Sequence, residues 1–573
     1  MTLQCFRTVG VLLLFTLLPI RLLAADIPSA AQAQIPNIVN PGLAKQPTFN
    51  NPTAGGKTVI AAPAKPVHPS ALPEAEKIHF KLTRITFTGN TVFSDAQLQA
   101  MVQPSINQII SLADLQGLAN KITEKYWEAG YILSRAILPP QQIVSGQVKI
   151  QVIEGFISAV SVSGTPGKAR SQIQEYGNNI LLSKPLNINV LERSLLLSND
   201  IPGTQVKAVL TPSTTVPESS DLTMIADRQL AQGYILYDNY GTRYLGPQEV
   251  TVGGNLNSFF TSGDSTAVQA VSTIHTKEMN FLQLTHSELL GASGTRLLVG
   301  GSYSKTLPGS ILQQLDIDGI ARSLFADLYY PWIRTRTQSL SLHTSAYYQN
   351  IYTEILQTPL YYDRIRSLVA GTHYDSTDSW HGVNAAGLDY SQGFNILGAN
   401  NGGMRSRPEG RSNFSKTQMN LSRSQYLSTH FSLYAAAQGQ YAFTPLLASE
   451  QFGVGGPIFG RGYDPYEISG DHGVAGTVEF RVDTAPGFRV LRAIQYYAFY
   501  DAGEVWNIDA RISGEPVRAT ATSTGLGVRF TFTQHFAANL FVAQPLNRPV
   551  ASAVAVGDNG KAPRGFFQVS AYI

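Results

Sequence analysis

One glycine-rich stretch of this chain carries a single arginine that could make a directed ionic contact. Within residues 452–465, the Gly-Gly-Pro run at 455–457 ends a strand, because proline lacks a ladder donor and glycine weakens strand interiors. The next residues, 459–463, predict a sharply bent loop with Arg461 at its tip. The forked guanidinium of an arginine suits a fixed planar partner such as a carboxylate.

Three carboxylates could be the partner of this arginine. Alternation along the stretch Tyr497-Ala498-Phe499-Tyr500-Asp501 places Asp501 on one side of a predicted strand, and a charged residue indicates that this side faces water. Glu479 and Asp483 lie on the strand predicted before it and compete for the same arginine. The residues alone leave this choice open.

Catalytic and metal-binding patterns are missing from the sequence. The ten histidines show no HExxH spacing, no CxxC pair exists, and no glycine-rich loop is followed by a phosphate-binding lysine. The only cysteine is Cys5, which lies in a segment that we expect to be removed, so a thiol nucleophile and a disulfide scaffold are excluded. We therefore expect no catalytic residues, no metal site, no cofactor and no enzymatic activity.

The composition indicates a large β-protein that faces lipid. With 573 residues the chain has room for two or three domains, and 42 Lys+Arg against 39 Asp+Glu give a net charge of +3, which gives no support to nucleic-acid binding. Charged residues make up 14%, well below the roughly 25% of soluble proteins. Tyrosine and phenylalanine stand at 26 each.

The N-terminal quarter begins with two segments that we do not expect to fold. Residues 1–25 predict a signal peptide, with Arg7 before an apolar run and cleavage near Ala24 or Ala25. A membrane-spanning helix is disfavoured because the run is short and Arg21 interrupts its end. Residues 26–76 are rich in proline and predict an extended or disordered linker.

Two small α+β units follow, at 77–155 and 156–229. In the first, 80–82 and 85–87 alternate as one strand, two helices begin at capping boxes (Ser94 with Gln97, Ser111 with Asp114), and two strands close the unit. The second unit has strand patterns around a helix at 191–199, and its middle, 164–185, is left without an assigned element.

Residues 230–573 predict a closed transmembrane barrel. Val478, Phe480 and Val482 alternate with Glu479, Arg481 and Asp483, so that one face suits lipid and the other a wet lumen. At about 20 residues per strand with its connection, this part predicts about 16 antiparallel strands, and closure removes every sheet edge. A soluble sandwich or propeller is disfavoured by the low charge and the many aromatic residues.

The loop run Phe-x-x-Gly-Gly-x-x-Phe-x-Arg-Gly-Tyr resembles the signature of the inward-folded loop in the Omp85 superfamily. More narrowly, the chain resembles the two-partner secretion transporters (TpsB, the ShlB/FhaC/HecB family), and Asp238-Asn239-x-Gly241 is a further match. The matching positions are Gly455, Gly456, Phe459, Arg461, Gly462 and Tyr463 in the loop, Phe499 and Asp501 in a later strand, and Gly89, Asn90, Gly130, Tyr131, Pro139, Gln141, Glu154 and Gly155 in the first small unit.

The resemblance implies a fold, a mechanism and a site. It implies that the two small units are POTRA domains and that the barrel holds an inward loop at 452–475. It also implies two-partner (type Vb) secretion. In this process the POTRA domains would capture an unfolded haemolysin-, adhesin- or haemophore-type exoprotein, and the barrel would pass it across the membrane. Arg461, Gly462, Tyr463 and Asp501 would latch the loop, with Gly455, Gly456, Phe459 and Phe499 supporting it.

The resemblance also implies a location and partners. We expect the outer membrane of a Gram-negative bacterium, with the linker and the POTRA domains in the periplasm. The expected partners are an exoprotein with an N-terminal secretion domain, outer-membrane lipid and lipopolysaccharide, and the barrel assembly machinery, with no nucleic acid and with the chain as a monomer. An Omp85-type factor that inserts other barrels is the alternative, and a passive porin would need no POTRA domains.

Two features depart from the family pattern. Many relatives thread an N-terminal plug helix through the barrel, but the prolines of 26–76 leave no room for a helix of several turns. Outer-membrane barrels usually end in Phe or Trp, whereas this sequence ends in Ile573, so we expect insertion that is intact but less efficient.

Overall fold

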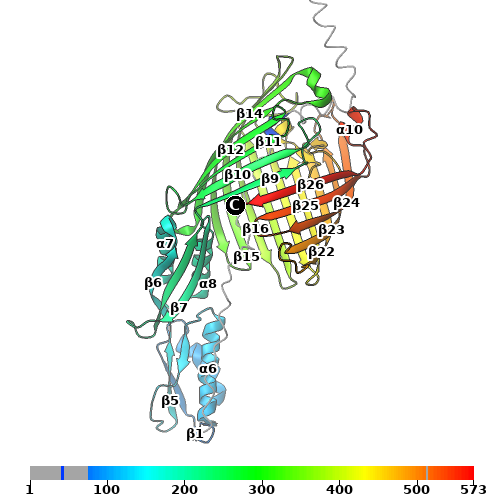
Figure 1. Cartoon of the computed structure of the whole chain (residues 1–573). Helices are drawn as coiled ribbons and strands as arrows, with labels where there is room; N and C mark the ends of the chain where they lie inside the picture. Colours follow the sequence, from blue (N-terminus) through cyan, green and yellow to red (C-terminus); the bar gives the residue numbers. More distant parts are fainter. Residues whose placement is uncertain (1–39, 44–74, 511–513) are drawn as a thin grey trace, which may run out of the picture.

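The computed structural model describes residues 40–43, 75–510 and 514–573. The predicted signal peptide and nearly all of the predicted linker lie outside the described residues. The exception is a 3-10 turn, η1 (Pro41–Leu43), which is buried inside the barrel, where Gly42 lies against Ile351. Figure 1 shows two small units in line below one end of a large barrel.

The first unit packs two helices on a three-stranded sheet. Its elements are β1 (His79–Lys81), β2 (Arg84–Thr88), α5 (Asp95–Val102), η2 (Gln103–Ser105), β3 (Ile109–Ser111), α6 (Leu112–Glu128), β4 (Arg135–Ile137) and β5 (Gln147–Ile153). Both predicted capping boxes are present at the starts of α5 and α6. The single strand predicted for 80–87 is wrong: β1 pairs with the unpredicted β3, while β2 pairs with β5, because the chain turns between them.

The second unit repeats this architecture and contains a helix that the sequence reading left unassigned. Its elements are β6 (Phe156–Thr165), η3 (Gly167–Ala169), α7 (Arg170–Leu181), α8 (Ile188–Asn199), β7 (Thr204–Pro212) and β8 (Ser219–Arg228). The helix α7 lies within the segment 164–185, for which the sequence predicted no element. Its cap, Ala169, makes no side-chain hydrogen bond, so the usual start signal is missing, although Ile173, Tyr176 and Ile180 are buried at helical spacing.

The remainder forms a closed antiparallel barrel of 16 strands, as predicted. The barrel strands are β9 (Ala231–Asp238), β10 (Glu249–Asn257), β11 (Ser265–Thr273), β12 (Met279–Leu290), β13 (Thr295–Thr306), β14 (Ile317–Arg334), β15 (Gln338–Ile355), β16 (Thr358–Thr377), β17 (Gly382–Gly393), β18 (Ser415–Tyr426), β19 (Phe431–Ala442), β22 (His472–Thr484), β23 (Ala493–Trp506), β24 (Arg518–Thr531), β25 (Phe536–Pro545) and β26 (Arg564–Tyr572). The barrel closes where β26 pairs with β9.

The two faces of the barrel wall differ as the alternation predicts. On β22, Val478 and Phe480 are exposed on the outside, whereas Glu479 between them is buried in the lumen. On β23, Tyr500 is exposed and Asp501 is fully buried. Apolar side chains therefore cover the outer wall and charged ones stay inside, as lipid requires. No helix of the described part of the chain is long and apolar enough to cross a membrane.

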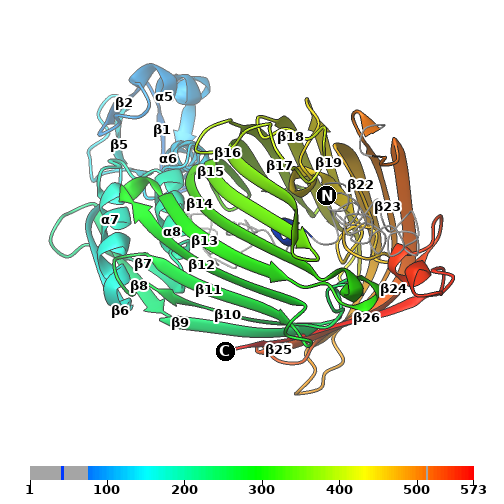
Figure 2. The ribbon, with the colours of Figure 1, turned by 90° about the horizontal axis from the view of Figure 1, so that it is seen from above.

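The second unit is fixed to the barrel by ionic and backbone contacts. Asp200, at the end of α8, accepts two hydrogen bonds from Arg334 at 2.7 and 2.8 Å, and Glu192 accepts from Arg336 at 3.0 Å. Arg193 donates to the Pro331 carbonyl at 2.7 Å. We call this end of the barrel the POTRA end and the opposite end the far end. Figure 2 shows both small units beside the β10–β16 side, away from β22–β24.

Breaking the Arg334–Asp200 contact should loosen the second unit from the barrel. In Arg334→Ala the Asp200 carboxylate stays half-enclosed without its partner, which costs about 3 kcal/mol. We expect faster deuterium exchange over 196–206 in the full chain in detergent, with the barrel strands unchanged. Lys207→Ala, at an exposed position of the same unit, is the control. Equal exchange in both variants would contradict this docking role.

Candidate functional site

A short hairpin folds back into the lumen between β19 and β22. Its strands are β20 (Phe452–Val454) and β21 (Ile468–Gly470), which pair antiparallel. We call residues 452–470 the inward hairpin. The predicted loop bounds, 452–475, extend too far, because 472–475 are the first residues of β22. The hairpin packs on the inner wall, with Val454 against Gly503 of β23.

The tip of the inward hairpin needs two glycines. Gly455 has φ +123° and Gly456 has φ +89°, and a Cβ on Gly455 would lie 2.0 Å from the Asp464 carbonyl oxygen. The Gly455 amide donates to the Phe459 carbonyl at 2.8 Å, and the Gly456 amide donates to the Tyr463 carbonyl at 3.1 Å. These bonds fold the tip on itself and leave Arg461 pointing at the barrel wall.

Arg461 lies in a buried ionic site on that wall. Its Nε and Nη2 donate to the two oxygens of Asp501 at 3.0 and 2.7 Å, and its backbone amide donates to Asp501 at 2.9 Å. Its Nη1 donates to Glu479 at 2.5 Å, and its Nη2 also donates to the Thr477 hydroxyl at 2.7 Å. Arg461 is 4% exposed and Asp501 is 0% exposed. The Phe499 ring lies 3.5 Å from the guanidinium carbon.

Glu479 is shared by three arginines, a feature that sequence reasoning missed. Besides Arg461, it accepts from Arg481 Nε at 2.7 Å and from Arg529 Nη2 at 3.2 Å. The sequence left open which carboxylate pairs with Arg461. In the structure its guanidinium bonds to two of the three candidates, Asp501 and Glu479. The third candidate, Asp483, instead accepts from Gln495 at 2.8 Å. Both extra arginines were recognisable as lumen-facing by alternation, but their common partner was not.

The residues after Arg461 hold the tip against a second part of the wall. Gly462 approaches β24 and β25 so closely that a Cβ would lie 3.0 Å from Ser523 Cβ and 2.9 Å from the Pro545 nitrogen. The Tyr463 hydroxyl donates toward the Thr522 carbonyl at 3.1 Å. Asp464, not singled out from the sequence, accepts from Arg564 at 2.6 Å.

The glycine, asparagine and acidic positions of the first unit's motif have structural partners. Gly89 has φ +82°, and a Cβ there would lie 2.2 Å from the Val152 carbonyl oxygen. The Asn90 side chain donates to the Phe93 carbonyl at 2.9 Å. The Glu154 carboxylate accepts hydrogen bonds from the Val92 amide at 2.9 Å, from the Thr91 amide and from the hydroxyl of Tyr126 on α6. These positions close the turn before α5.

The other motif positions join the two units or order the segment before β5. The Gly130 carbonyl accepts from the Ile188 amide at 2.8 Å, and the Gly155 carbonyl accepts from the Leu186 amide at 3.0 Å. Gln141 pairs with the backbone of Lys149 at 2.7 and 2.8 Å, and also donates to the Pro139 carbonyl. The ring of Tyr131 packs edge-on against that of Tyr126. In the described residues no three His, Cys, Asp or Glu side chains gather as metal ligands do.

The hydrogen bonds to Glu154 make the first unit sensitive to acid. Burial raises the pKa of this carboxyl, but the bonds from Thr91, Val92 and Tyr126 outweigh it, so the pKa lies below its usual value. A carboxyl whose pKa is lowered by folding stabilises the folded state at pH values above its ordinary pKa. This contribution is lost as the pH falls through the lowered pKa of the folded state. Glu154→Gln should cost about 2 kcal/mol of the first unit's stability and remove this acid dependence.

Pulse proteolysis of the full chain in urea, with the barrel kept in detergent, measures this stability at pH 7 and pH 4. The control is Glu124→Gln on the solvent side of α6. A pH dependence that survives in Glu154→Gln would contradict the role given to this carboxylate.

A methyl group at Gly462 should displace the tip of the inward hairpin. In Gly462→Ala the new Cβ meets the backbone of β25 and the Ser523 side chain, and such overpacking costs about 1–3 kcal/mol. We expect amide exchange over 455–467 to rise about tenfold in the full chain. Gly565→Ala, where a Cβ would meet nothing within 4 Å, is the matched control. Unchanged exchange in Gly462→Ala would show that the tip is not held by this close approach.

Comparison with known proteins assigns both parts of the chain. The family model described as haemolysin secretion/activation protein ShlB/FhaC/HecB matches residues 221–530, and the model of the ShlB-type POTRA domain matches 80–155. The heme/hemopexin transporter protein HuxB of Haemophilus influenzae is 26% identical over 491 residues, covering 83% of this chain and 86% of the relative. The outer membrane transporter CdiB of Dickeya dadantii is 24% identical, covering 75% and 76%.

Solved structures show the same fold. CdiB from Escherichia coli superposes with a TM-score of 0.70 at 18% identity, covering 95% of this chain and 98% of that one. BamA from Haemophilus ducreyi lacking POTRA domains 1–3 superposes with a TM-score of 0.50 at 12% identity, covering 86% and 100%. Because the ShlB/FhaC/HecB model covers more than half of the sequence, this chain belongs to that family, the two-partner secretion transporters of the Omp85 superfamily.

Proposed function

We propose that this chain captures one unfolded exoprotein through its POTRA domains and passes it through its barrel across the outer membrane. The observation that carries the proposal is the inward hairpin, which occupies the lumen and is held there by the buried Arg461 network. A transporter needs such a gate, because the lumen must stay sealed until a substrate arrives.

The ionic network suits a latch that can be released. If Arg461 leaves, Glu479 keeps its bonds to Arg481 and Arg529, so that carboxylate stays compensated. Among the described residues, Asp501 would keep one hydrogen-bond donor, the Ser523 hydroxyl at 3.3 Å. Most of the cost of release therefore falls on the Arg461–Asp501 pair, because an unpaired buried charge is strongly unfavourable.

The second POTRA domain offers an edge for an extended chain. Its sheet has the order β6-β8-β7, so β7 has a free side, and Val209 and Leu210 are exposed there. An incoming segment can add a strand to such an edge through main-chain hydrogen bonds, with little demand on its sequence. This supports a role in holding an unfolded exoprotein near the POTRA end.

The cargo that we propose is a haemolysin-, adhesin- or haemophore-type exoprotein with an N-terminal secretion domain. The relatives are named for different cargoes, a heme/hemopexin transporter and a hemolysin transporter among them, so their names support the class and not one member. The POTRA domains then lie in the periplasm, and the far end faces the medium. The barrel assembly machinery inserts the chain as a monomer among lipid and lipopolysaccharide. Folding of the cargo outside the cell drives export, since the periplasm supplies no ATP.

Removing the Arg461 side chain should uncouple the hairpin from the wall and impair export. We expect Arg461→Ala to lower secretion of a co-expressed two-partner exoprotein at least about tenfold, because the wrongly placed hairpin obstructs the lumen. Arg481→Ala is the matched control, since it also loses a bond to Glu479 but leaves the hairpin anchored. A chain lacking residues 78–229 should retain the exoprotein in the periplasm.

The measurement is exoprotein in the medium, with barrel levels in the outer membrane followed in parallel. Normal secretion by Arg461→Ala would contradict the latch. Normal secretion combined with failed assembly of other barrels would identify the chain as an insertion factor, the alternative function.

A further inference from the structure

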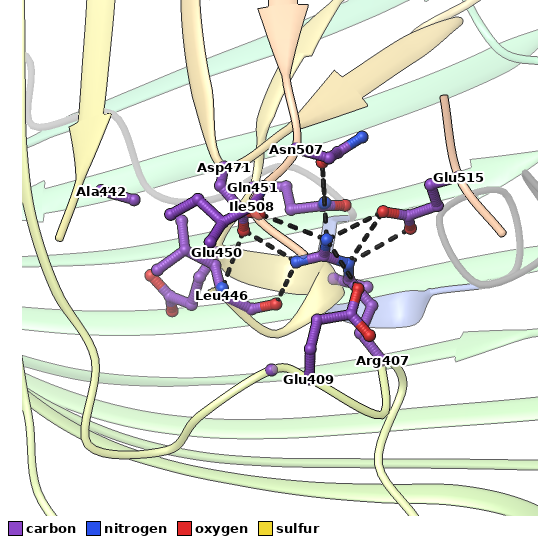
Figure 3. Close-up of polar contacts among 12 residues, drawn as sticks. Arg407, Glu409, Ala442, Leu446, Glu450, Gln451, Asp471, Asn507, Ile508 and Glu515 are labelled. Carbon is purple, nitrogen blue, oxygen red and sulfur yellow. Dashed lines mark hydrogen bonds and ion pairs between the residues drawn. The ribbon is translucent and has the colours of Figure 1, made fainter. Parts of the chain in front are cut away.

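A second buried arginine lies at the far end of the barrel, outside the site described above. Arg407 is 1% exposed and belongs to residues 394–414, which connect β17 and β18. Figure 3 shows its guanidinium beside residues of two further connections, at 443–451 with Asp471 and at 507–510 with 514–517. These three connections, which we call the mouth loops, join neighbouring strands of the barrel, β17 to β18, β19 to β22 and β23 to β24.

Arg407 bonds to both of the other mouth loops at once. Its Nη1 donates to Asp471 at 2.7 Å and to the Leu446 carbonyl at 2.6 Å. Its Nη2 lies 2.8 Å from Glu515 and 2.9 Å from Glu409. One side chain thus joins three segments that are far apart in the sequence.

Asp471 completes the junction from the base of the inward hairpin. Its carboxylate accepts from the Leu446 amide and from the Ile508 amide, each at 2.8 Å. Two of the three loops also meet through the Ala448 amide, which donates to the Ser406 hydroxyl at 3.0 Å. The Arg407–Asp471 pair is therefore the centre of the contacts that hold the mouth loops together.

An apolar cluster links the mouth loops to the inner wall of the barrel. It joins inward-facing residues of β14, β15 and β16 to the mouth loops, and Ile508 packs against it from the connection after β23. Its buried members are Ala321, Ile351, Tyr361, Ile365, Phe414, Ala442, Leu446 and Leu447. The mouth loops are thereby held against the wall on the β14–β16 side.

The junction holds more negative than positive charge. Glu409, Asp471 and Glu515 surround the single guanidinium, and no side chain of the three is more than 9% exposed. The nearby Glu450 is paired with Lys416 at 2.8 Å. Without Arg407 the three carboxylates would repel one another in a place that water hardly reaches, and separation of the loops would relieve that repulsion.

We propose that Arg407 locks the far mouth of the barrel, as a barrier separate from the Arg461 latch, and that the mouth loops must part before an exported chain can leave. The claim that the mouth loops part during export rests on the proposed function. The claim that Arg407 locks the mouth concerns the barrel without cargo and can be tested without an exoprotein.

The first test is ion conductance of the purified full chain in planar lipid bilayers. We expect Arg407→Met, which keeps the length of the side chain and removes its charge, to raise the open fraction at least tenfold over wild type. Arg405→Met is the matched control, because the described hydrogen bond of Arg405 goes to Gly410 of its own loop. The proposed lock would be contradicted if Arg407→Met conducted no more than wild type. It would also be contradicted if Arg405→Met conducted as much as Arg407→Met.

Acid gives a readout that general misfolding would not produce. Burial raises the pKa of the Glu515 carboxyl. The positive charge of Arg407 lowers this pKa, whereas the negative charges of Glu409 and Asp471 raise it further, and the net shift is upward. A raised pKa in the closed state means that the closed mouth binds a proton more tightly than the open one, so a lower pH favours closure. The open fraction of Arg407→Met should therefore fall between pH 7.5 and pH 5. An open fraction that stays constant would contradict the electrostatic origin of the opening.

A thiol staple tests the moving parts in a chain that keeps Arg407. The Ser406–Ala448 contact suits a cysteine pair, S406C with A448C, and Cys5 in the predicted signal peptide is the only natural cysteine. We expect the oxidised staple to block exoprotein secretion and dithiothreitol to restore it. Equal secretion in both redox states would overturn the requirement that the loops part. If wild type secretes no exoprotein, the proposed function fails, and the conductance measurements still decide the lock.

Discussion

A buried charge is tolerated in this barrel where an opposite charge lies within bonding distance, and the arrangement of the lumen depends on this constraint. Arg461 can enter the wall because Asp501 and Glu479 take its fork together, and Glu479 can stay ionised because Arg481 and Arg529 also reach it. The same rule applies at Arg407 and Asp471. The strong penalty for an unpaired buried charge makes each site nearly all-or-none, which is what a gate requires.

The two ionic sites divide the inward hairpin between them. Arg461 holds its tip on β22 and β23, whereas Asp471, at its base, bonds to Arg407 and Ile508 of the other two mouth loops. The second POTRA domain is anchored beside β12–β14 by Asp200 and Glu192, which leaves the opposite wall, where the hairpin packs, free of it. The proposed capture and gating sites therefore lie on different sides of the barrel. The contacts of the POTRA attachment include no residue of the inward hairpin.

The sequence predicted what depends on local patterns and missed what depends on the meeting of distant segments. Alternation was sufficient for the barrel and for the two faces of β22 and β23, and capping boxes marked α5 and α6. The helix α7 was missed because Ala169 provides no cap. The Arg461–Asp501 pairing came from a family resemblance, not from spacing. The junction around Arg407 brings residues 407, 471 and 515 together only in the folded barrel, so no local pattern could indicate it.

The central claim is that a polypeptide passes through this lumen. The most direct test places a photoreactive amino acid at Ser391, which faces the lumen, or at its neighbour Tyr390, which is 46% exposed on the outer wall of β17. An exoprotein arrested during export is then irradiated in whole cells. The account predicts crosslinks from position 391 and none from position 390. Crosslinks from 390 alone, or from neither position while export proceeds, would show that the substrate takes another path.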